Sequence, residues 1–207
     1  MRDKPPPDIS NREPALDALL AEAEALHAEF ITGIIEAGDF CPWARGARLG
    51  ERSEVRGCWL DELPAFLRAL PSEPEREVWQ LVVPDGPARA MPWREHVAQL
   101  ERALRREDRP LPFAFAAFHP QHPGRPESIG GTIGLLRRSP LPAIQLIRLD
   151  ALDNVRARAR ARVEGLAEDN KKNIARLTDG DLRPLHAALM ERSFDLRQRI
   201  AEAHADF

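Results

Sequence analysis

The sequence predicts an α/β (or α+β) protein in which a mixed sheet of about four strands packs with helices, followed by a C-terminal helical hairpin. Two observations carry this prediction. Through the first two thirds of the chain, short apolar runs with turn residues at their ends alternate with stretches whose apolar residues recur every three or four positions. The last third of the chain shows only apolar residues that recur every three or four positions, the spacing of a helix. A chain of 207 residues can also bury a sizeable core.

The chain divides into three segments by composition. Residues 1–13 are polar and rich in proline, and they carry too little apolar surface to offset the entropy of ordering, so we expect a loose tail. Residues 14–149 hold the strand patterns and form the predicted α/β core. Residues 150–207 carry helical patterns alone and form the predicted C-terminal helical extension.

The first half of the core alternates helix and strand. A long helix begins near Pro14, and its apolar residues recur at helical spacing until Gly38, which is suited to end it. Two short apolar runs with strand composition follow, and a helical pattern that Asp61 begins lies between them. The second run ends in Pro-Asp-Gly-Pro, a strong turn signal. We therefore expect strands at 54–60 and 77–83.

The second half of the core continues the alternation before the chain becomes helical throughout. A helix over 92–106 precedes an apolar strand at Phe113–Phe118, and the glycine-rich segment from Pro123 to Gly134 is expected to be irregular. The last strand covers 143–149. Two amphipathic patterns then meet at a turn and form the predicted hairpin, over 150–177 and 181–204.

The composition argues against nucleic acid and membranes as partners. The chain carries 30 basic and 33 acidic residues and a formal net charge of -3, so no overall field attracts nucleic acid or an anionic membrane surface. No apolar stretch approaches the roughly 20 residues of a membrane span, and the polar start lacks the apolar core of a secretion signal. The sequence therefore predicts a cytoplasmic protein whose two cysteines are free thiols.

One local run of arginines could still attract nucleic acid. Arg156, Arg158, Arg160 and Arg162 alternate with small apolar residues, and on a helix this spacing spreads them around the cylinder. Acidic residues follow them, and no aromatic neighbours offer surfaces for base stacking. We expect no nucleic-acid partner.

Two His-Pro pairs end the apolar strand at Phe113–Phe118 and mark the first candidate site. His119 and His122 are each followed by proline, which forces an extended exit from the strand. Strand ends in α/β proteins are where ligands and catalytic groups gather. The pair could serve as acid and base near neutral pH, share a metal, or only cap the strand end.

The second candidate is Cys41 in Cys-Pro-Trp-Ala, which lies on a predicted turn after the first helix. A thiol in such a place is reactive if a cation or an imidazole lowers its pKa, and His119 is the natural candidate partner. The alternative is a small buried apolar residue, the commonest fate of a lone cysteine. Trp43 adjoins this thiol and could wall a pocket.

The third candidate is the basic turn before the last predicted strand. Arg138 follows Arg137 and precedes Ser139, and a guanidinium with a neighbouring hydroxyl can hold a carboxylate or a phosphate. The alternative is a solvated turn. The nearby glycines lack the strand-to-helix context of a dinucleotide-binding fingerprint, so we do not expect a nucleotide.

The three motifs occur in one order and resemble the markers of a bacterial family known only as a domain of unknown function. Its members carry Cys-Pro-Phe-Ala, then Ser-Phe-His-Pro, then Asn-Arg-Ser-Pro-Tyr-Pro, and the similarity covers roughly residues 16 to 177. The resemblance implies one shared site built from Cys41, His119 and Arg138. The chain departs from the pattern at Arg137 and Gln145, where the family has asparagine and histidine, and at residues 128–131, where it usually has acidic residues.

The leading hypothesis is an enzyme that acts on a small anionic molecule at the strand ends. Cys41 would be nucleophile or ligand and His119 acid, base or ligand, because polar motifs at loop positions interrupt otherwise apolar elements. The expected substrate contacts are Trp43, His122, Arg138 and Ser139.

Two other classes of protein stay open. The first is a metal- or haem-binding sensor or carrier, for which the candidate ligands are Cys41, His119 and His122, since Cys-Pro can supply an axial thiolate to haem iron. The second is a non-catalytic interaction module whose helices over 150–204 bind a protein partner. The sequence does not decide whether the protein is an enzyme.

Overall fold

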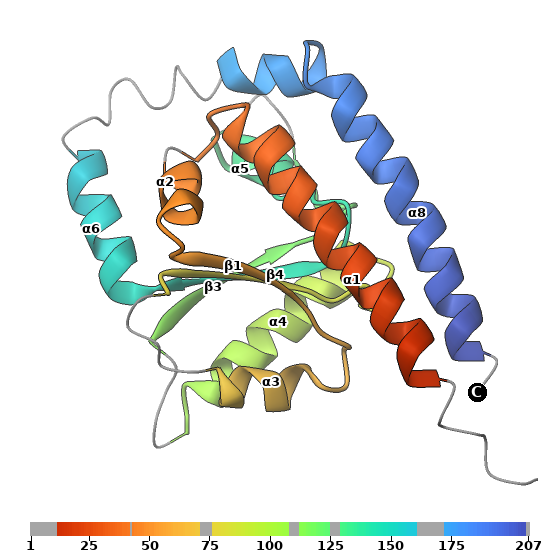
Figure 1. The fold of residues 1–207 in the computed structure, drawn as a ribbon. Helices are drawn as coiled ribbons and strands as arrows, with labels where there is room; N and C mark the ends of the chain where they lie inside the picture. The colour runs from red at the N-terminus through yellow and green to blue at the C-terminus, as the bar shows by residue number, and fades with distance from the viewer. Residues whose placement is uncertain are drawn as a thin grey trace, which may run out of the picture.

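The centre of the protein is a four-stranded mixed sheet. The computed structural model describes residues 12–41, 43–70, 76–107, 112–124, 129–160 and 172–205. The strand order is β1-β2-β4-β3 (Figure 1). The strands are β1 Ser53–Gly57, β2 Val78–Val82, β3 Phe113–Phe118 and β4 Ala143–Arg148.

Three strands of the sheet run in the same direction. β1 pairs with β2 in parallel, and β4 pairs antiparallel with both β2 and β3. β1, β2 and β3 therefore end at one edge of the sheet, where β4 begins. In the register, Val82 lies opposite both Gly57 and Ala143, and Ala143 lies opposite Phe118. We call this edge the carboxyl edge.

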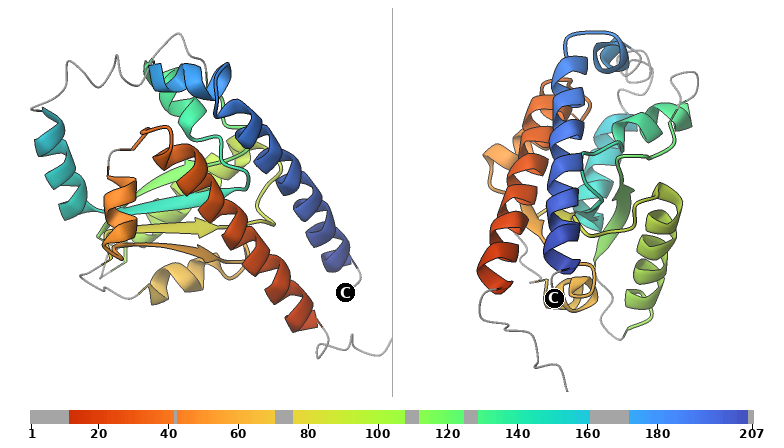
Figure 2. Two further views of the ribbon diagram at one scale, coloured as in Figure 1. Left: turned by 45° about the horizontal axis from the view of Figure 1, so that its top comes forward. Right: turned by 90° about the vertical axis from the view of Figure 1, so that its right-hand side faces the viewer.

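Helices cover both faces of the sheet (Figures 1 and 2). On one face, α1 (Arg12–Phe30) continues as the π-helix η2 (Ile31–Glu36) and packs against the C-terminal helix α8 (Arg183–Ala205). On the opposite face lie α3 (Leu63–Ala69) and α4 (Ala90–Leu104). The other helices are α2 (Ala44–Leu49), α5 (Ile129–Leu136), α6 (Leu149–Arg160) and the helical residues 172–178.

Two apolar clusters, one on each face of the sheet, form the core. The first joins α1, η2 and α8 to the sheet, and includes Leu26, Val82, Leu189, Leu196 and Ile200. The second joins the sheet to α3 and α4, and includes Leu63, Leu67, Trp79, Trp93 and Ile144. The apolar stripe of α8 is thus buried against α1 inside the molecule. The prediction of a mixed sheet of about four strands packed with helices is confirmed.

The predicted elements are present with shifts of one to three residues at most ends, and one segment differs in kind. The irregular segment predicted at 123–134 is wrong, because α5 occupies its second half. A Cβ on Gly134 would lie 2.1 Å from the backbone oxygen of Pro123, so glycine is needed there for close packing. Glycine has a poor helix propensity, but at this position the packing of the helix against Pro123 requires it. The turn expected after Cys41 is also followed by an unpredicted helix, α2.

The first helix ends near the predicted stop, but Gly38 is not the residue in left-handed conformation. That residue is Asp39, with φ of 51°. A Cβ on Gly38 would lie 2.3 Å from the ring of Phe40, so close packing requires glycine here. The tail predicted at 1–13 lies outside the described residues, apart from the backbone at the start of α1.

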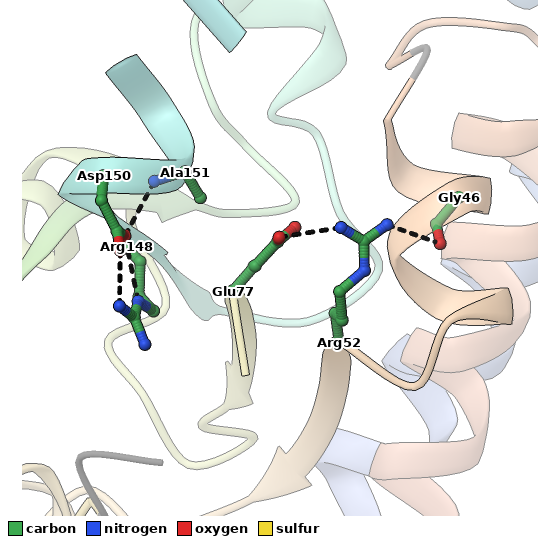
Figure 3. A network of polar contacts seen from close by, with 6 residues as sticks. All are labelled: Gly46, Arg52, Glu77, Arg148, Asp150 and Ala151. Carbon is green, nitrogen blue, oxygen red and sulfur yellow. Dashed lines mark hydrogen bonds and ion pairs between the residues drawn. The ribbon is translucent and has the colours of Figure 1, made fainter. Parts of the chain in front are cut away.

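Polar contacts tie the helices to the sheet at the edge opposite the carboxyl edge (Figure 3). Arg52 donates from Nη1 to Glu77 Oε1 at 2.8 Å and from Nη2 to the Gly46 oxygen at 3.2 Å, so it joins α2 to the start of β2. Arg148 donates to Asp150 at the start of α6. None of the described helices combines the length and the apolar character that crossing a lipid bilayer requires.

Candidate functional site

The carboxyl edge brings together four of the residues that the sequence singled out. His119 follows β3 directly and His122 lies three residues later, while Arg138 and Ser139 form the turn before β4. Since β4 begins where β3 ends, the two loops lie side by side. Their hydrogen bonds decide what each side chain can do.

His119 is a neutral, fully buried ring with both nitrogens occupied. The Gln121 N–H donates to its Nδ1 at 3.0 Å, so Nε2 carries the proton and donates to the Pro87 oxygen at 2.9 Å. Burial is the main cause that lowers the pKa of His119. The backbone N–H of His119 donates to the Arg137 oxygen at 3.0 Å. The residue therefore joins the loops after β2 and β3 and before β4, and offers no free nitrogen to a substrate or a metal.

His122 has one free nitrogen in a cationic environment. Its Nδ1 lies 3.0 Å from the Pro123 oxygen and donates to it, which leaves Nε2 as an unprotonated acceptor. Nε2 is buried and has no hydrogen-bond partner among the described residues. Burial lowers the pKa of His122, and the charges of Arg94, Arg137 and Arg138 lower it further.

Arg138 and Ser139 brace the loops. Arg138 donates from Nε to the His122 oxygen at 2.9 Å and from Nη2 to the Gly124 oxygen at 3.3 Å. The buried Ser139 hydroxyl donates to the Leu141 oxygen. Both groups predicted to clamp an anion are therefore bound to backbone carbonyls.

Arg137 and Arg94 are two further cations whose charges act on His122. Arg137 is half-buried, and burial and the charge of Arg94 lower its pKa. The contact shown by Arg94 is a weak one, from Nη1 to Met91 Sδ at 3.7 Å. Within the described residues, neither guanidinium has a carboxylate partner.

A pocket of about 450 Å³ opens between the start of α4 and the loop after β3, and the cation among its lining residues is Arg89. Arg94 touches its wall at Met91, and His122 lies between two lining residues. α4 begins without a side-chain cap and has no acidic residue in its first turn. We call this the α4 pocket, lined by Arg89, Ala90, Met91, Pro92, Gln121 and Pro123.

A second polar group lies where α8 crosses the carboxyl edge. Asp85 accepts the Leu60 N–H at 3.0 and 3.1 Å, and burial raises the pKa of its carboxyl group. Arg197 of α8 donates to the Gly86 oxygen at 3.1 Å, and burial lowers its pKa. His204 packs edge-on against Trp59 at 5.1 Å. These contacts fasten α8 to the loops after β1 and β2.

Cys41 does not join the carboxyl-edge residues. It lies between η2 and α2, and burial raises the pKa of its thiol, with a smaller contribution from Asp39 and Glu36. No hydrogen bond or electrostatic interaction of the described residues connects it to His119. Trp43, half-buried, precedes α2, and Pro42 lies outside the described residues. The thiol environment is the reverse of that of an activated nucleophile.

The three candidate metal ligands, Cys41, His119 and His122, do not converge. Over the described parts of the chain, no three side chains of histidine, cysteine, aspartate or glutamate come together as a metal site requires. Cys58, the other thiol, is buried, and burial raises its pKa to about 12. Burial thus disfavours the thiolate form of both cysteines.

The sequence did not single out Arg94. It singled out Arg138 as the anion-binding arginine, whereas Arg138 is bound to backbone carbonyls and Arg137 is the neighbouring cation without a carboxylate partner in the described structure. Adjacent residues of a turn point in different directions, so the sequence could not tell which arginine faces the backbone. Arg94 lies far from both motifs along the chain, and its place in the first turns of a helix was the one available signal.

The fold and the pocket define an α/β protein with a cationic pocket at the carboxyl edge of its sheet. No protein-family model, curated protein or solved structure matches the chain.

Proposed function

We propose that the protein binds a small anionic molecule, carrying a carboxylate or a phosphate, in the α4 pocket. The observation that carries the proposal is the cationic setting of the pocket: Arg89 lines it, and Arg94 contacts its wall at Met91. Arg94 and Arg137 have no carboxylate partner in the described structure, and the charge of Arg94 lowers the pKa of Arg137, as expected for like charges that repel. A bound anion would replace that repulsion with attraction and with charge-assisted hydrogen bonds.

The start of α4 supports the same charge preference. The first N–H groups of a helix have no acceptor within the helix, and the helix dipole adds a partial positive charge there. Ala90, Met91 and Pro92 of this first turn line the pocket, and Arg89 precedes them. The pocket lining contains no acidic residue.

The walls indicate that the ligand also has an apolar part. Met91, which is 53% exposed, lines the pocket with Pro92 and Pro123. A volume of about 450 Å³ is within the range of small-molecule sites. We therefore favour a compact organic anion over a bare inorganic ion.

The earlier hypotheses gain less support. A thiol enzyme needs a low thiol pKa, whereas burial raises that of Cys41. Within α8, a partner-binding role would have to use the outer side of the helix, since Leu189, Leu196 and Ile200 are buried in the core. The resemblance to a family marked by Cys41, His119 and Arg138 stays a prediction.

The test is calorimetric titration with phenyl phosphate and benzoate as probes. We expect binding that falls about tenfold or more in Arg137→Gln and in Arg94→Gln, because each variant removes a positive charge that acts near the pocket, on His122. Arg102→Gln, an exposed position on the same helix, is the matched control and should keep wild-type affinity. Unchanged affinity in both pocket variants, or no binding of either probe to the wild type, would refute the proposal.

A further inference from the structure

We propose that a second pocket, on the α3 side of β1, binds a short zwitterion with an apolar side chain, of which apolar α-amino acids are the simplest class. This site is independent of the α4 pocket. It has a volume of about 520 Å³, and we call it the α3 pocket. Its lining residues are Glu54, Arg56, Phe66, Ala69, Leu70, Arg76 and Trp79.

The pocket lies beside β1, which is an outer strand of the sheet with a neighbour on one side only. Glu54 and Arg56 are two residues apart on a strand, so they share the face that α3 covers, and Glu54 lies opposite Trp79 in the register. On the neighbouring strand, Trp79 and Leu81 of the same face are buried in the core. Charged residues of β1 therefore stand next to apolar ones of β2 on this face of the sheet.

The charged side of the pocket displays both signs. Glu54 accepts from Arg56 Nη2 at 2.5 Å and lies 3.4 Å from Arg76 Nη2. Arg76 also donates to the Glu51 oxygen at 2.6 Å, which fixes its guanidinium. Only 20% of the Glu54 side chain is exposed, so its carboxylate is held in place between two cations. A carboxylate has about four acceptor positions, which leaves capacity for a ligand donor.

The other lining residues of the pocket are apolar. Leu70 and Trp79 are buried, Phe66 is half-buried and Ala69 is exposed at the end of α3. These side chains offer a surface for an aliphatic or aromatic group, with the charged side next to it.

This arrangement selects for a ligand with both charges. A simple anion would meet the arginines but also the fixed carboxylate of Glu54, and a simple cation would meet two guanidiniums. The carboxylate and ammonium of an amino acid lie close together, so one can bind Arg56 while the other binds Glu54. Its side chain then lies against Phe66 and Trp79.

The test compares three probes by calorimetric titration. L-phenylalanine has both charges, 3-phenylpropanoate lacks the ammonium group and phenethylamine lacks the carboxylate. We expect L-phenylalanine to bind about tenfold or more tightly than either analogue, since each analogue loses one charge-assisted interaction. No binding of L-phenylalanine at its solubility limit, or equal affinity for either analogue, would overturn the proposal.

Variants locate the binding on the molecule. Ala69→Phe should fill the pocket and abolish binding, while Ala65→Phe, also exposed on α3 but outside the lining, should leave it unchanged. Arg56→Gln should weaken binding about tenfold, and the exposed Arg68→Gln should not. Circular dichroism checks that each variant folds. Retained binding in both Ala69→Phe and Arg56→Gln contradicts the assignment, as does loss of L-phenylalanine binding in Arg137→Gln, which would place the amino acid in the α4 pocket.

Discussion

His27 is a buried histidine that the fold keeps neutral. It lies on α1 with no exposed surface, and Gln80 of β2 is its polar neighbour. Neither ring nitrogen has a well-formed hydrogen bond within the described structure, and the Gln80 side-chain oxygen also lacks one. Burial lowers the pKa of His27 from 6.5 to about 4, and Gln80 opposes this shift only in part.

This shift predicts a loss of stability in acid. Between the unfolded pKa of 6.5 and the folded pKa of about 4, the unfolded chain binds a proton that the folded chain does not. The free energy of unfolding should therefore fall as the pH drops through this window, by on the order of 3 kcal/mol from His27 alone. Urea titrations at pH 7, 5.5 and 4.5 should show the fall in the wild type and a smaller one in His27→Leu. An equal fall in both proteins would exclude His27 as the cause.

At the scale of elements, the site depends on a close contact between two glycine backbones. A Cβ on Gly124 would lie 2.3 Å from the Leu135 nitrogen, and one on Gly134 would lie 2.9 Å from the Gly124 Cα. α5 thus packs directly on the loop that holds His122. Arg138 donates across this contact to the Gly124 oxygen.

Two alanine substitutions test the importance of this contact. Gly134→Ala should lower the free energy of unfolding by about 2 kcal/mol, because the added methyl group forces α5 and the loop apart. Gly46→Ala is the matched control in α2, where a Cβ meets nothing within 4 Å, and it should stabilise the protein by about 0.4–1 kcal/mol. Thermal unfolding measures both. Similar melting temperatures for the two variants would show that α5 can move freely.

Sequence patterns predict those elements whose pattern is local. The strand predicted at Phe113–Phe118 matches β3 because apolar composition and the following proline act within a few residues. α5 was missed because its glycines serve a contact with another part of the chain. The same reason applies to the site. His119, His122, Arg138 and Ser139 lie in neighbouring loops at the strand ends, but their hydrogen bonds join distant parts of the chain and the sequence does not show them. Cys41, which the resemblance grouped with His119 and Arg138, has no hydrogen bond to them within the described residues.

At the scale of the whole molecule, the C-terminal helix belongs to the main core. The apolar cluster that contains α1 also contains Leu141 before β4 and Leu196 of α8. It therefore crosses the boundary drawn at residue 149 from composition. Arg197 and His186 add bonds from α8 to the loops, to the oxygens of Gly86 and Arg138.

This continuity predicts one unfolding transition. Leu196→Ala should destabilise the protein by about 2–5 kcal/mol, because Leu196 is fully buried. Phe194→Ala, two residues away and 70% exposed, should change stability by less than about 0.5 kcal/mol. Tryptophan fluorescence, which reports on Trp43, Trp59, Trp79 and Trp93, and far-UV circular dichroism should shift together in Leu196→Ala. Separate transitions for the two signals would show that α8 unfolds independently.

The pairing of α1 with α8 also determines how the protein would respond to a pulling force. Arg192 pairs with Glu29 at 2.6 Å and Arg199 with Glu22 at 2.5 Å, so the two helices are antiparallel. The amino end of α1 and the carboxyl end of α8 lie at one corner of the molecule (Figure 1). Tension applied between these two helix ends would separate α1 from α8 one turn after another, and would not pull the strands of the sheet past one another.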